Sequence, residues 1–481
     1  MAVDDVAAGI DFGTTRSALT VRRGGSAVHV GTPDGLPMPS VVAVNLLTGE
    51  RRVGEEASDM TEQLRETHLV VRSVKLKLAE GGQWEAANRL WTAEDVAGCI
   101  FTELRKRAEA QVGTLPDAVP TVVTTPVGFS AAGRRALRTA AAGAGFAVQA
   151  FVPESTAALF PLRRRLRAHR FVVVVDWGGG TLDVSVLEQA GRSLLERATR
   201  CLASGGDAID SLLAEWVTGR LGTAWTDLSA KDQDYVLRVA ERAKRRLSAD
   251  AEVPLTFTLG ARDVTLPLTR AQLTRLVAPR VEEAIGVIKA AVNAAGISVD
   301  GVGRFVFVGG SARLYSFWQA VRTDETFAGQ EEFPPAPDWF VADGAALLAE
   351  RGGRYLAAEG AGMLLSDGSV HPLVRPGECV EDLDRTIRVG LVEDAQAAQI
   401  PVGTYPATRE GNSWTGYPER FRMMQCLTVP TMGFSDEAID VRLWMSPDLT
   451  VHVRASSHQR GEPYEWEWSP QPLSLMYELP E

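Results

Sequence analysis

Two short segments of this chain combine a carboxylate with glycine and threonine at the end of an apolar run. The first is Ile10-Asp11-Phe12-Gly13-Thr14-Thr15, and the second is Val175-Asp176-Trp177-Gly178-Gly179-Gly180-Thr181-Leu182-Asp183. In such turns small residues let the backbone approach a ligand, N–H groups and hydroxyls can point at phosphate oxygens, and the aspartate can hold a hydrated cation. Because both halves of the chain carry one, the pair predicts a phosphate clamp in an internally duplicated nucleotide-binding domain.

A third segment, Glu241-Arg242-Ala243-Lys244-Arg245-Arg246-Leu247-Ser248, is predicted to belong to a helix. Its residues Glu241, Lys244, Arg245 and Ser248 are spaced to share one face. On that face a glutamate could bind ribose hydroxyls, and an arginine could stack on a purine. Taken alone, the pattern is equally typical of an exposed helix with ion pairs, so its meaning depends on the other segments.

Two further segments fit the same kind of site. Gly309-Gly310-Ser311-Ala312-Arg313 follows an apolar strand, so its backbone can approach a sugar or a base. Lys75, in Arg72-Ser73-Val74-Lys75, offers a cation for a terminal phosphate, and the alternative is an exposed lysine near Lys77. The sequence contains no GxxxxGK[ST] segment, so the predicted site is not a P-loop.

The elements that must position these residues alternate between strands and helices up to about residue 350, which is typical of an α/β fold. Each phosphate-binding turn is expected to join two antiparallel strands. We expect these strands at 6–11 and 18–21, and at 171–176 and 182–187. We expect helices at 93–112, 131–142, 235–248 and within 269–295.

Beyond residue 350 the pattern changes to short strands. Asp367-Gly368 between two apolar runs predicts a hairpin. Apolar residues alternate with others along 439–445 and 449–455, as in half-buried strands. The expected organisation is a nucleotide-binding domain at 1–350, a linker at 351–362 and an antiparallel β-sandwich at 363–481.

Bulk composition excludes several classes of protein. A chain of 481 residues is too long for one core. The net charge of −11 argues against general nucleic-acid binding, which needs a basic surface. No CxxC pair occurs, so we expect neither a zinc site nor a disulfide framework. Residues 1–8 contain no apolar run of the kind found in signal peptides, and no apolar run elsewhere is long enough for a membrane span. We therefore expect a cytoplasmic protein.

Taken in order, these segments resemble a known family. The order is DFGTT, RSVK, PESTAAL, DWGGGTLD, ASGGDAID, ERAKRRLS, VGGSARL and PDWFVADGAA. It is similar to the ATPase domain of the seventy-kilodalton heat-shock chaperones, the DnaK-like members of the actin-like ATPase superfamily. The resemblance covers about residues 5–350, and ERAK with its following serine separates this family from sugar kinases and actins. It implies an α/β fold with two lobes built on ribonuclease-H-like halves, followed by a small antiparallel β-sandwich.

The resemblance also implies slow, Mg²⁺-dependent ATP hydrolysis, with K⁺ as a further cation that such a site accepts. By position, Asp11 and Asp176 would hold Mg²⁺, mainly through water, with Glu154 behind them. Lys75 would stabilise charge on the γ-phosphoryl group, where electrostatics and positioning supply most of the catalysis.

The remaining roles follow from the same positions. Asp183 and Thr181 would help to place the attacking water. The phosphates of ATP or ADP would be contacted by Gly13, Thr14, Thr15, Arg16, Gly178, Gly179 and Gly180. The nucleoside would be lined by Gly206, Glu241, Lys244, Arg245, Ser248, Gly309, Gly310, Ser311, Arg313 and Asp338.

Some positions depart from the family pattern. Arg16 stands where the family usually has an uncharged residue, and Ser155 and Tyr315 each replace a proline. The segment 353–362 lacks the leucine-rich run ending in aspartate that couples nucleotide state to the peptide domain, and no helical lid is expected after the β domain. Without a lid, a bound peptide should leave quickly.

Two functions therefore remain open. One is an ATP-hydrolysing, DnaK-like chaperone whose truncated β domain binds peptide segments, with a co-chaperone or exchange factor as a further partner. The other is a nucleotide-dependent scaffold or regulatory module that binds one dedicated protein partner. Neither involves nucleic acid or a membrane. A filament-forming or sugar-phosphorylating relative is disfavoured by the ERAK helix and by the β tail.

Overall fold

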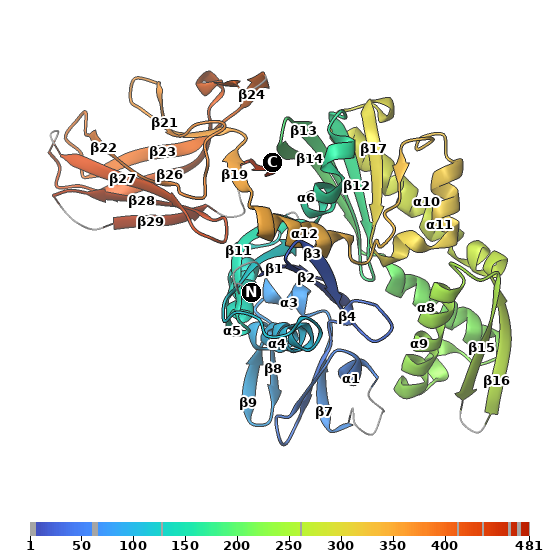
Figure 1. Ribbon diagram of the computed structural model, residues 1–481. Helices are drawn as coiled ribbons and strands as arrows, with labels where there is room; N and C mark the ends of the chain where they lie inside the picture. Colours follow the sequence, from blue (N-terminus) through green and yellow to red (C-terminus); the bar gives the residue numbers. More distant parts are fainter. Residues whose placement is uncertain are drawn as a thin grey trace. The chain divides into compact units, whose positions relative to one another are not determined.

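The computed structural model describes residues 6–59, 66–126, 128–259, 262–410, 413–434, 437–459, 463–468 and 473–480 (Figure 1). The chain divides into two compact units. The first unit comprises Met1–Val127, Ala136–Glu188 and Glu196–Glu350, and the second comprises Gly128–Arg135, Gln189–Leu195 and Arg351–Glu481. The sequence did not indicate that the two short segments at 128–135 and 189–195 belong with the second unit.

The first sheet of the first unit has the order β11-β10-β1-β2-β3, with β4 beside β2. Its strands are β1 (Val6–Phe12), β2 (Arg16–Arg23), β3 (Ser26–Val30), β4 (Met38–Pro39), β10 (Val119–Thr125) and β11 (Phe146–Pro153). Strand β1 is antiparallel to β2 and parallel to β10. Phe12 stacks on Phe101 of α4 (Ala93–Val112), with ring centroids 5.1 Å apart. On the opposite face, a Cβ at Gly9 would lie 2.0 Å from the backbone nitrogen of Ala346, so α12 (Phe340–Arg351) approaches there.

The second sheet repeats this arrangement. Within the first unit it has the order β18-β17-β12-β13-β14, whereas β30 and β19 belong to the second unit, where β30 pairs with residues 193–195. Strand β12 is antiparallel to β13 and parallel to β17, as β1 is to β2 and β10. The strands are β12 (Phe171–Trp177), β13 (Leu182–Ala190), β14 (Ser193–Leu202), β17 (Val302–Val308), β18 (Glu331–Glu332), β19 (Arg354–Ala357) and β30 (Leu475–Glu478). The repetition confirms the predicted duplication and the two hairpins around the glycine-threonine turns.

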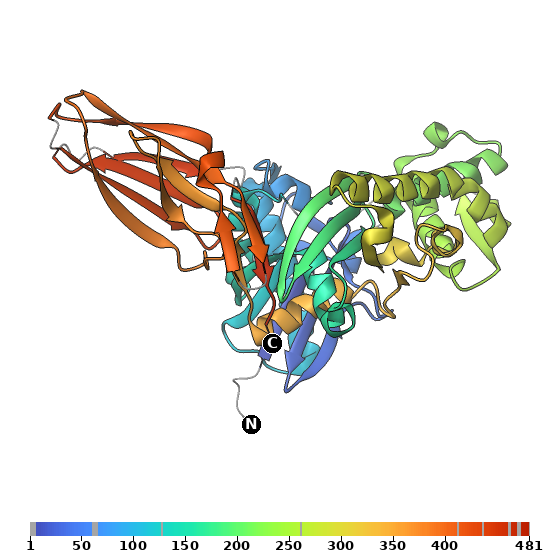
Figure 2. The same ribbon diagram turned by 90° about the horizontal axis from the view of Figure 1, so that it is seen from above.

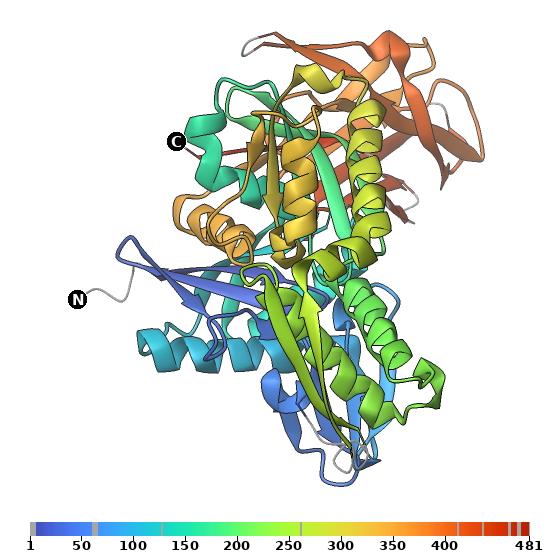
Figure 3. The ribbon, with the colours of Figure 1, turned by 90° about the vertical axis from the view of Figure 1, so that its right-hand side faces the viewer.

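Several helices accompany this second sheet in the first unit. They are α6 (Glu154–Leu159), α7 (Arg163–Leu166), α8 (Gly206–Arg220), α9 (Ala230–Arg246), α10 (Arg270–Ala294) and α11 (Tyr315–Thr323). Trp177 of β12 meets Phe317 of α11 edge to face, with centroids 4.7 Å apart, inside an apolar cluster that includes α8, α9 and α10. A capping box between Thr269 and Gln272 starts α10. Figure 3 shows α9 (green) alongside the hairpin of β15 (Glu252–Leu259) and β16 (Arg262–Thr269).

Smaller elements complete the first unit. They are β5 (Val42–Asn45), β6 (Arg51–Val53), β7 (His68–Val71), β8 (Gln83–Ala86), β9 (Arg89–Thr92), α1 (Glu55–Ser58), α3 (Val74–Leu78) and α5 (Ala131–Gly143), whose first residues belong to the second unit. Helix α3 carries Lys75 and therefore matters for the site. Among the described residues, no helix combines the length and apolarity needed to cross a bilayer.

The second unit contains two four-stranded antiparallel sheets, β21-β20-β23-β26 and β22-β27-β28-β29 (Figure 2). Their strands are β20 (Gly360–Leu364), β21 (Val370–Val374), β22 (Asp384–Gly390), β23 (Ala397–Tyr405), β26 (Arg422–Pro430), β27 (Ala438–Met445), β28 (Val451–Ser457) and β29 (Pro463–Trp468), beside a small hairpin of β24 (Ala407–Glu410) and β25 (Ser413–Gly416). Strand β26 of one sheet contacts β28 of the other, and Leu427, Val441 and Val453 are fully buried. This is the expected antiparallel β-sandwich.

The segment 351–362 was predicted to be a linker, yet it contains β19 and begins β20. Glycines can mark a flexible connection, but in this segment they allow close packing. A Cβ at Gly353 would lie 2.4 Å from the Tyr477 hydroxyl, and one at Gly360 would lie 2.0 Å from the Tyr405 ring. Glycine content alone does not distinguish these two uses.

Candidate nucleotide-binding site

A buried ion pair lies at the centre of the candidate site. The Lys75 Nζ atom of α3 is 2.7 Å from Oε1 of Glu154, the first residue of α6. Lys75 is only 4% exposed, whereas Lys77 lies at the surface and pairs with Glu80. Burial alone lowers the pKa of Lys75, but the charges of Glu154 and Asp11 outweigh it, so the net pKa is raised and the ammonium persists. The alternative of an exposed lysine is therefore wrong.

Three aspartates interact electrostatically with this pair. Asp11 is the last residue but one of β1 and accepts a hydrogen bond of 2.9 Å from Thr124 on the neighbouring strand. Asp176, near the end of β12, lies opposite Asp183 of β13 in the antiparallel register. The Thr181 hydroxyl donates to Asp183 over 2.6 Å. The structure thus gathers all six side chains proposed for catalysis from five separate elements of the first unit and the turn between β12 and β13.

Burial, together with neighbouring charges at Glu154 and Asp176, raises the pKa values of these carboxyl groups. Burial raises the pKa of Asp11, and burial with the neighbouring carboxylates raises that of Asp176 well above its usual range. Burial, followed by the charges of Asp11 and Asp183, raises the pKa of Glu154 to about 7 although Lys75 opposes the shift. Four carboxyl groups around one ammonium leave an excess of negative charge, which a bound cation would relieve.

The character of this donor set fits a hydrated cation. In the described parts of the chain, no group of three or more His, Cys, Asp or Glu side chains is arranged as a metal site. Mg²⁺ retains several of its waters in such places and contacts carboxylates through them. The carboxylates of Asp11, Asp176 and Glu154 are oxygen donors of the kind that Mg²⁺ contacts through water, and their assignment to Mg²⁺ stays a prediction.

The two glycine-threonine turns face each other. A Cβ at Gly179 would lie 2.6 Å from Oγ1 of Thr15, and one at Gly180 would lie 3.6 Å from the Thr14 methyl carbon. Gly13 is equally confined, because its Cβ would lie 2.1 Å from the Arg16 carbonyl oxygen. At Gly179 a side chain would therefore collide with the opposite turn, and close approach of two such turns is the geometry that a phosphate clamp requires.

Backbone contacts join the second turn to the predicted nucleoside pocket. The Gly178 carbonyl accepts hydrogen bonds from the Gly206 N–H (3.0 Å) and from the Ser311 hydroxyl (2.8 Å). Gly309 has φ +82°, and a Cβ there would lie 2.4 Å from Oδ1 of Asp176. Gly310 is confined by Asp338 in the same way, at 2.7 Å. The glycine-rich turn after β17 therefore lies directly beside the carboxylate cluster.

Helix α9 contributes Glu241, Lys244 and Arg245 to the predicted pocket. Lys244 Nζ donates to the Gly206 carbonyl (2.9 Å) and pairs with Asp210 (2.8 Å). Arg313 pairs with Asp338 at 3.2 Å. Ser248 follows the end of α9, where its N–H donates to the Arg245 carbonyl. The predicted side chains thus surround the turns, with Lys244 linking α9 directly to the first residue of α8.

Arg16, which was predicted to contact phosphate, makes an ion pair that the prediction did not include. Its guanidinium pairs with Glu241 of α9, with Nη2 2.9 Å from Oε1. Arg245 lies 3.8 Å from the same oxygen. The first turn and the nucleoside helix are therefore joined by a charge contact that the spacing of residues did not reveal.

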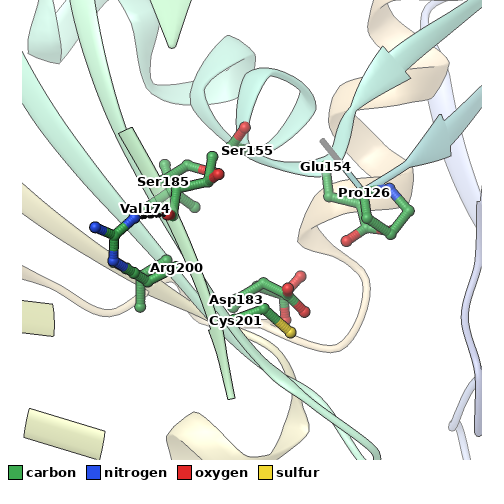
Figure 4. A pocket seen from close by; sticks show the side chains of 11 residues that line it. Pro126, Glu154, Ser155, Val174, Asp183, Ser185, Arg200 and Cys201 are labelled. Atoms are coloured by element: carbon green, nitrogen blue, oxygen red, sulfur yellow. Dashed lines mark hydrogen bonds between the residues drawn. The ribbon is translucent and has the colours of Figure 1, made fainter. Parts of the chain in front are cut away.

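A pocket extends beyond the carboxylates, as Figure 4 shows. Pro126, Glu154 and Asp183 line it together with Ser155, Arg200 and Cys201. Burial, then the charge of Asp183, raises the pKa of Cys201 to about 12, so this sulfur stays a thiol. Sequence reasoning did not single out Arg200 and Cys201, because nothing in the sequence of β14 marks that strand as part of a site.

Sequence reasoning also missed several polar residues. Asp207 accepts a hydrogen bond from Thr15 over 3.2 Å, and Asp210 binds Lys244. Both stand in the segment ASGGDAID, whose aspartates could have been considered. Thr124 gave no signal, because threonine is common in strands.

A comparison with known protein families shows the family to which this chain belongs. The family model described as Hsp70 protein matches residues 50–374, about two thirds of the chain. The match includes Lys75, Glu154, the second turn, α9 and the turn after β17. The first turn at residues 11–15 precedes it, so its place in the site rests on the geometry described above. The chain belongs to the Hsp70 family.

Proposed function

We propose that this chain binds ATP and ADP between its two glycine-threonine turns and hydrolyses ATP slowly with Mg²⁺. Family membership supports an ATP-binding role of the chaperone type. The observation that carries the proposal is the buried Lys75–Glu154 pair among Asp11, Asp176 and Asp183. Burying a charged ammonium beside an excess of carboxylates costs free energy. A ligand that contacts the ammonium and brings a cation to the carboxylates would offset that cost.

In this proposal each group has one task. The turns bind the phosphates through backbone N–H groups and threonine hydroxyls, and bound Mg²⁺ would neutralise charge between phosphate oxygens. Lys75 stabilises charge that develops on the γ-phosphoryl group. Asp183, which accepts a hydrogen bond from Thr181, orients the attacking water. Glu154 lines the same pocket as Asp183. The side chains of Glu241, Lys244 and Arg245 hold the nucleoside.

We propose further that the second unit binds a protein segment. Loops 391–396 and 431–434 are joined by the Thr431 N–H, which donates to the Gln396 carbonyl over 3.1 Å. These loops expose Val392, Met432 and Phe434, which are 71%, 52% and 59% exposed. Exposed apolar side chains clustered on two joined loops favour a protein partner. The proposed division is a nucleotide-binding domain at 1–350, a connection at 351–362 and a partner-binding β domain at 363–481.

A measurement of phosphate release from ATP tests the catalytic part. The purified chain is expected to hydrolyse ATP slowly with Mg²⁺ and to stop when Mg²⁺ is chelated. Release equal to that of a Lys75→Ala variant would contradict the proposal.

The partner class is tested separately. Binding of many unrelated unfolded peptides, with an affinity that changes with ATP, supports the chaperone function. Stable recovery of one folded protein supports a scaffold or regulatory module instead.

The four cysteines are free thiols, which favours a reducing compartment such as the cytoplasm as the place of action.

A further inference from the structure

Arg16 begins β2, directly after the first glycine-threonine turn, and reaches α9. Its Nη2 atom is 2.9 Å from Oε1 of Glu241, and its Nη1 atom donates to the Pro37 carbonyl over 3.1 Å. The second bond fixes the guanidinium from the side of the first sheet. The ion pair therefore connects the phosphate turn to the helix whose carboxylate is proposed to bind ribose.

The charges around Glu241 keep it ionised. Burial alone would raise the pKa of Glu241, but Arg16, then Lys244 and Arg245, hold it below the usual value. Arg245 approaches the same oxygen as Arg16, at 3.8 Å. Both ion pairs use Oε1, and neither uses Oε2. A carboxylate has about four lone-pair sites, so Oε2 can still accept two donors.

We propose that Arg16 is a positioning residue for Glu241 and determines the preference of the site for ribonucleotides. By holding Oε1, it fixes the carboxylate with Oε2 available to the ribose hydroxyls. A glutamate without this anchor must lose side-chain rotamer freedom when the sugar binds, which weakens the ribose contact. The inference rests on the proposed nucleotide site and names the residue that sets its sugar preference.

The test is calorimetric binding of ADP and of 2′,3′-dideoxy-ADP to the full chain. The wild type is expected to prefer ADP by about tenfold or more, because hydrogen bonds to a charged group are among the strongest available. In Arg16→Ala the preference is expected to fall to about threefold or less. A lost phosphate contact would weaken both ligands equally, so the ratio isolates the effect on the sugar.

Arg22→Ala is the matched control. Arg22 lies on the same strand and pairs with Glu350 at 3.0 Å, so the variant removes a comparable ion pair from β2. It is expected to retain the wild-type preference. Retention of that preference by Arg16→Ala as well would overturn the inference.

Glu241→Gln provides a second route if Arg16→Ala folds poorly. It is expected to lose the ribose preference, and the double variant Arg16→Ala with Glu241→Gln should lose no more than Glu241→Gln alone. A further loss in the double variant would contradict the inference. If the wild type binds both ligands equally, this inference fails alone. If the wild type binds neither, the proposed function fails with it.

Discussion

Lys75 is buried beside four carboxyl groups, and this imbalance is the main chemical fact at the scale of single residues. Burial raises the pKa values of Asp11, Glu154 and Asp176, and the charges of neighbouring carboxylates add to the rise for Glu154 and Asp176. A bound cation would therefore stabilise the carboxylates of this cluster, and an anionic ligand could contact the lysine. A Mg²⁺–nucleotide complex supplies both.

Replacing Lys75 by alanine should separate binding from chemistry. We expect ADP affinity within a few fold of wild type and hydrolysis slowed by about 10²–10³-fold, because the lysine acts on charge that develops in the transition state. The measurement is single-turnover hydrolysis together with calorimetry. Lys77→Ala, which removes an exposed ion pair on the same helix, serves as the control. Equal hydrolysis rates in wild type and Lys75→Ala would remove Lys75 from the mechanism.

Asp210 predicts a pH effect on stability. Burial raises its pKa from 3.8 to about 7 although Lys244 opposes the shift. Between these values the folded chain binds more protons than the unfolded chain, so this group lowers the free energy of unfolding as pH rises towards 7. In Asp210→Asn the melting temperature should therefore fall less between pH 5 and pH 8. Parallel declines for variant and wild type, without nucleotide, would contradict the assignment.

At the scale of elements, much of the site framework could be predicted. The helix expected at 93–112 is α4. Both hairpins around the turns form, and their strands are antiparallel as expected. Periodicity and turn residues determine such elements locally. The ion pair between Arg16 and Glu241, and the tie of Ser155 to Glu196 at 2.5 Å, join residues far apart in sequence. No local pattern encodes such contacts.

The turn after β17 gives a prediction at this scale. Gly309 has φ +82°, and an added Cβ would lie 2.4 Å from Oδ1 of Asp176. Gly309→Ala should therefore lower stability by about 1–3 kcal/mol through backbone strain, and should weaken ADP binding by displacing the carboxylate. The measurements are thermal unfolding and calorimetry.

Gly296→Ala is the control for this variant. Gly296 has φ +70°, but nothing lies within 4 Å of its added Cβ. It should show the same kind of strain without loss of ADP affinity. Equal loss of affinity in both variants would mean that strain, and not the contact with Asp176, explains the effect.

At the scale of the whole molecule, the chain combines a duplicated α/β unit with a β-sandwich unit. The glycine-threonine turns recur because the same strand arrangement recurs. In the second unit, the alternation of apolar residues along 439–445 and 449–455 predicted two strands. These are β27 and β28, along which buried and partly exposed residues alternate. Its inclusion of 128–135 and 189–195 could not be predicted, because those segments join it only through tertiary packing.

The exposed loops of the second unit give a prediction at this scale. Met432→Ser with Phe434→Ser should weaken binding of an apolar peptide by about fivefold or more, because each removes exposed apolar area. ADP affinity should not change. Leu47→Ser, at a position 89% exposed in the first unit, is the control and should leave peptide binding intact. Unchanged peptide affinity in the double variant, measured by fluorescence anisotropy, would exclude these loops.

The central claim is that the carboxylate cluster and the two turns form a Mg²⁺-dependent adenine-nucleotide site. Calorimetric titration of the full chain with ADP, with and without Mg²⁺, tests it most directly. We predict one site per chain, tighter binding with Mg²⁺, and loss of that Mg²⁺ effect in Asp176→Asn, whose carboxylate is proposed to hold the hydrated ion. Absence of ADP binding, or an unchanged Mg²⁺ effect in Asp176→Asn, would contradict the claim.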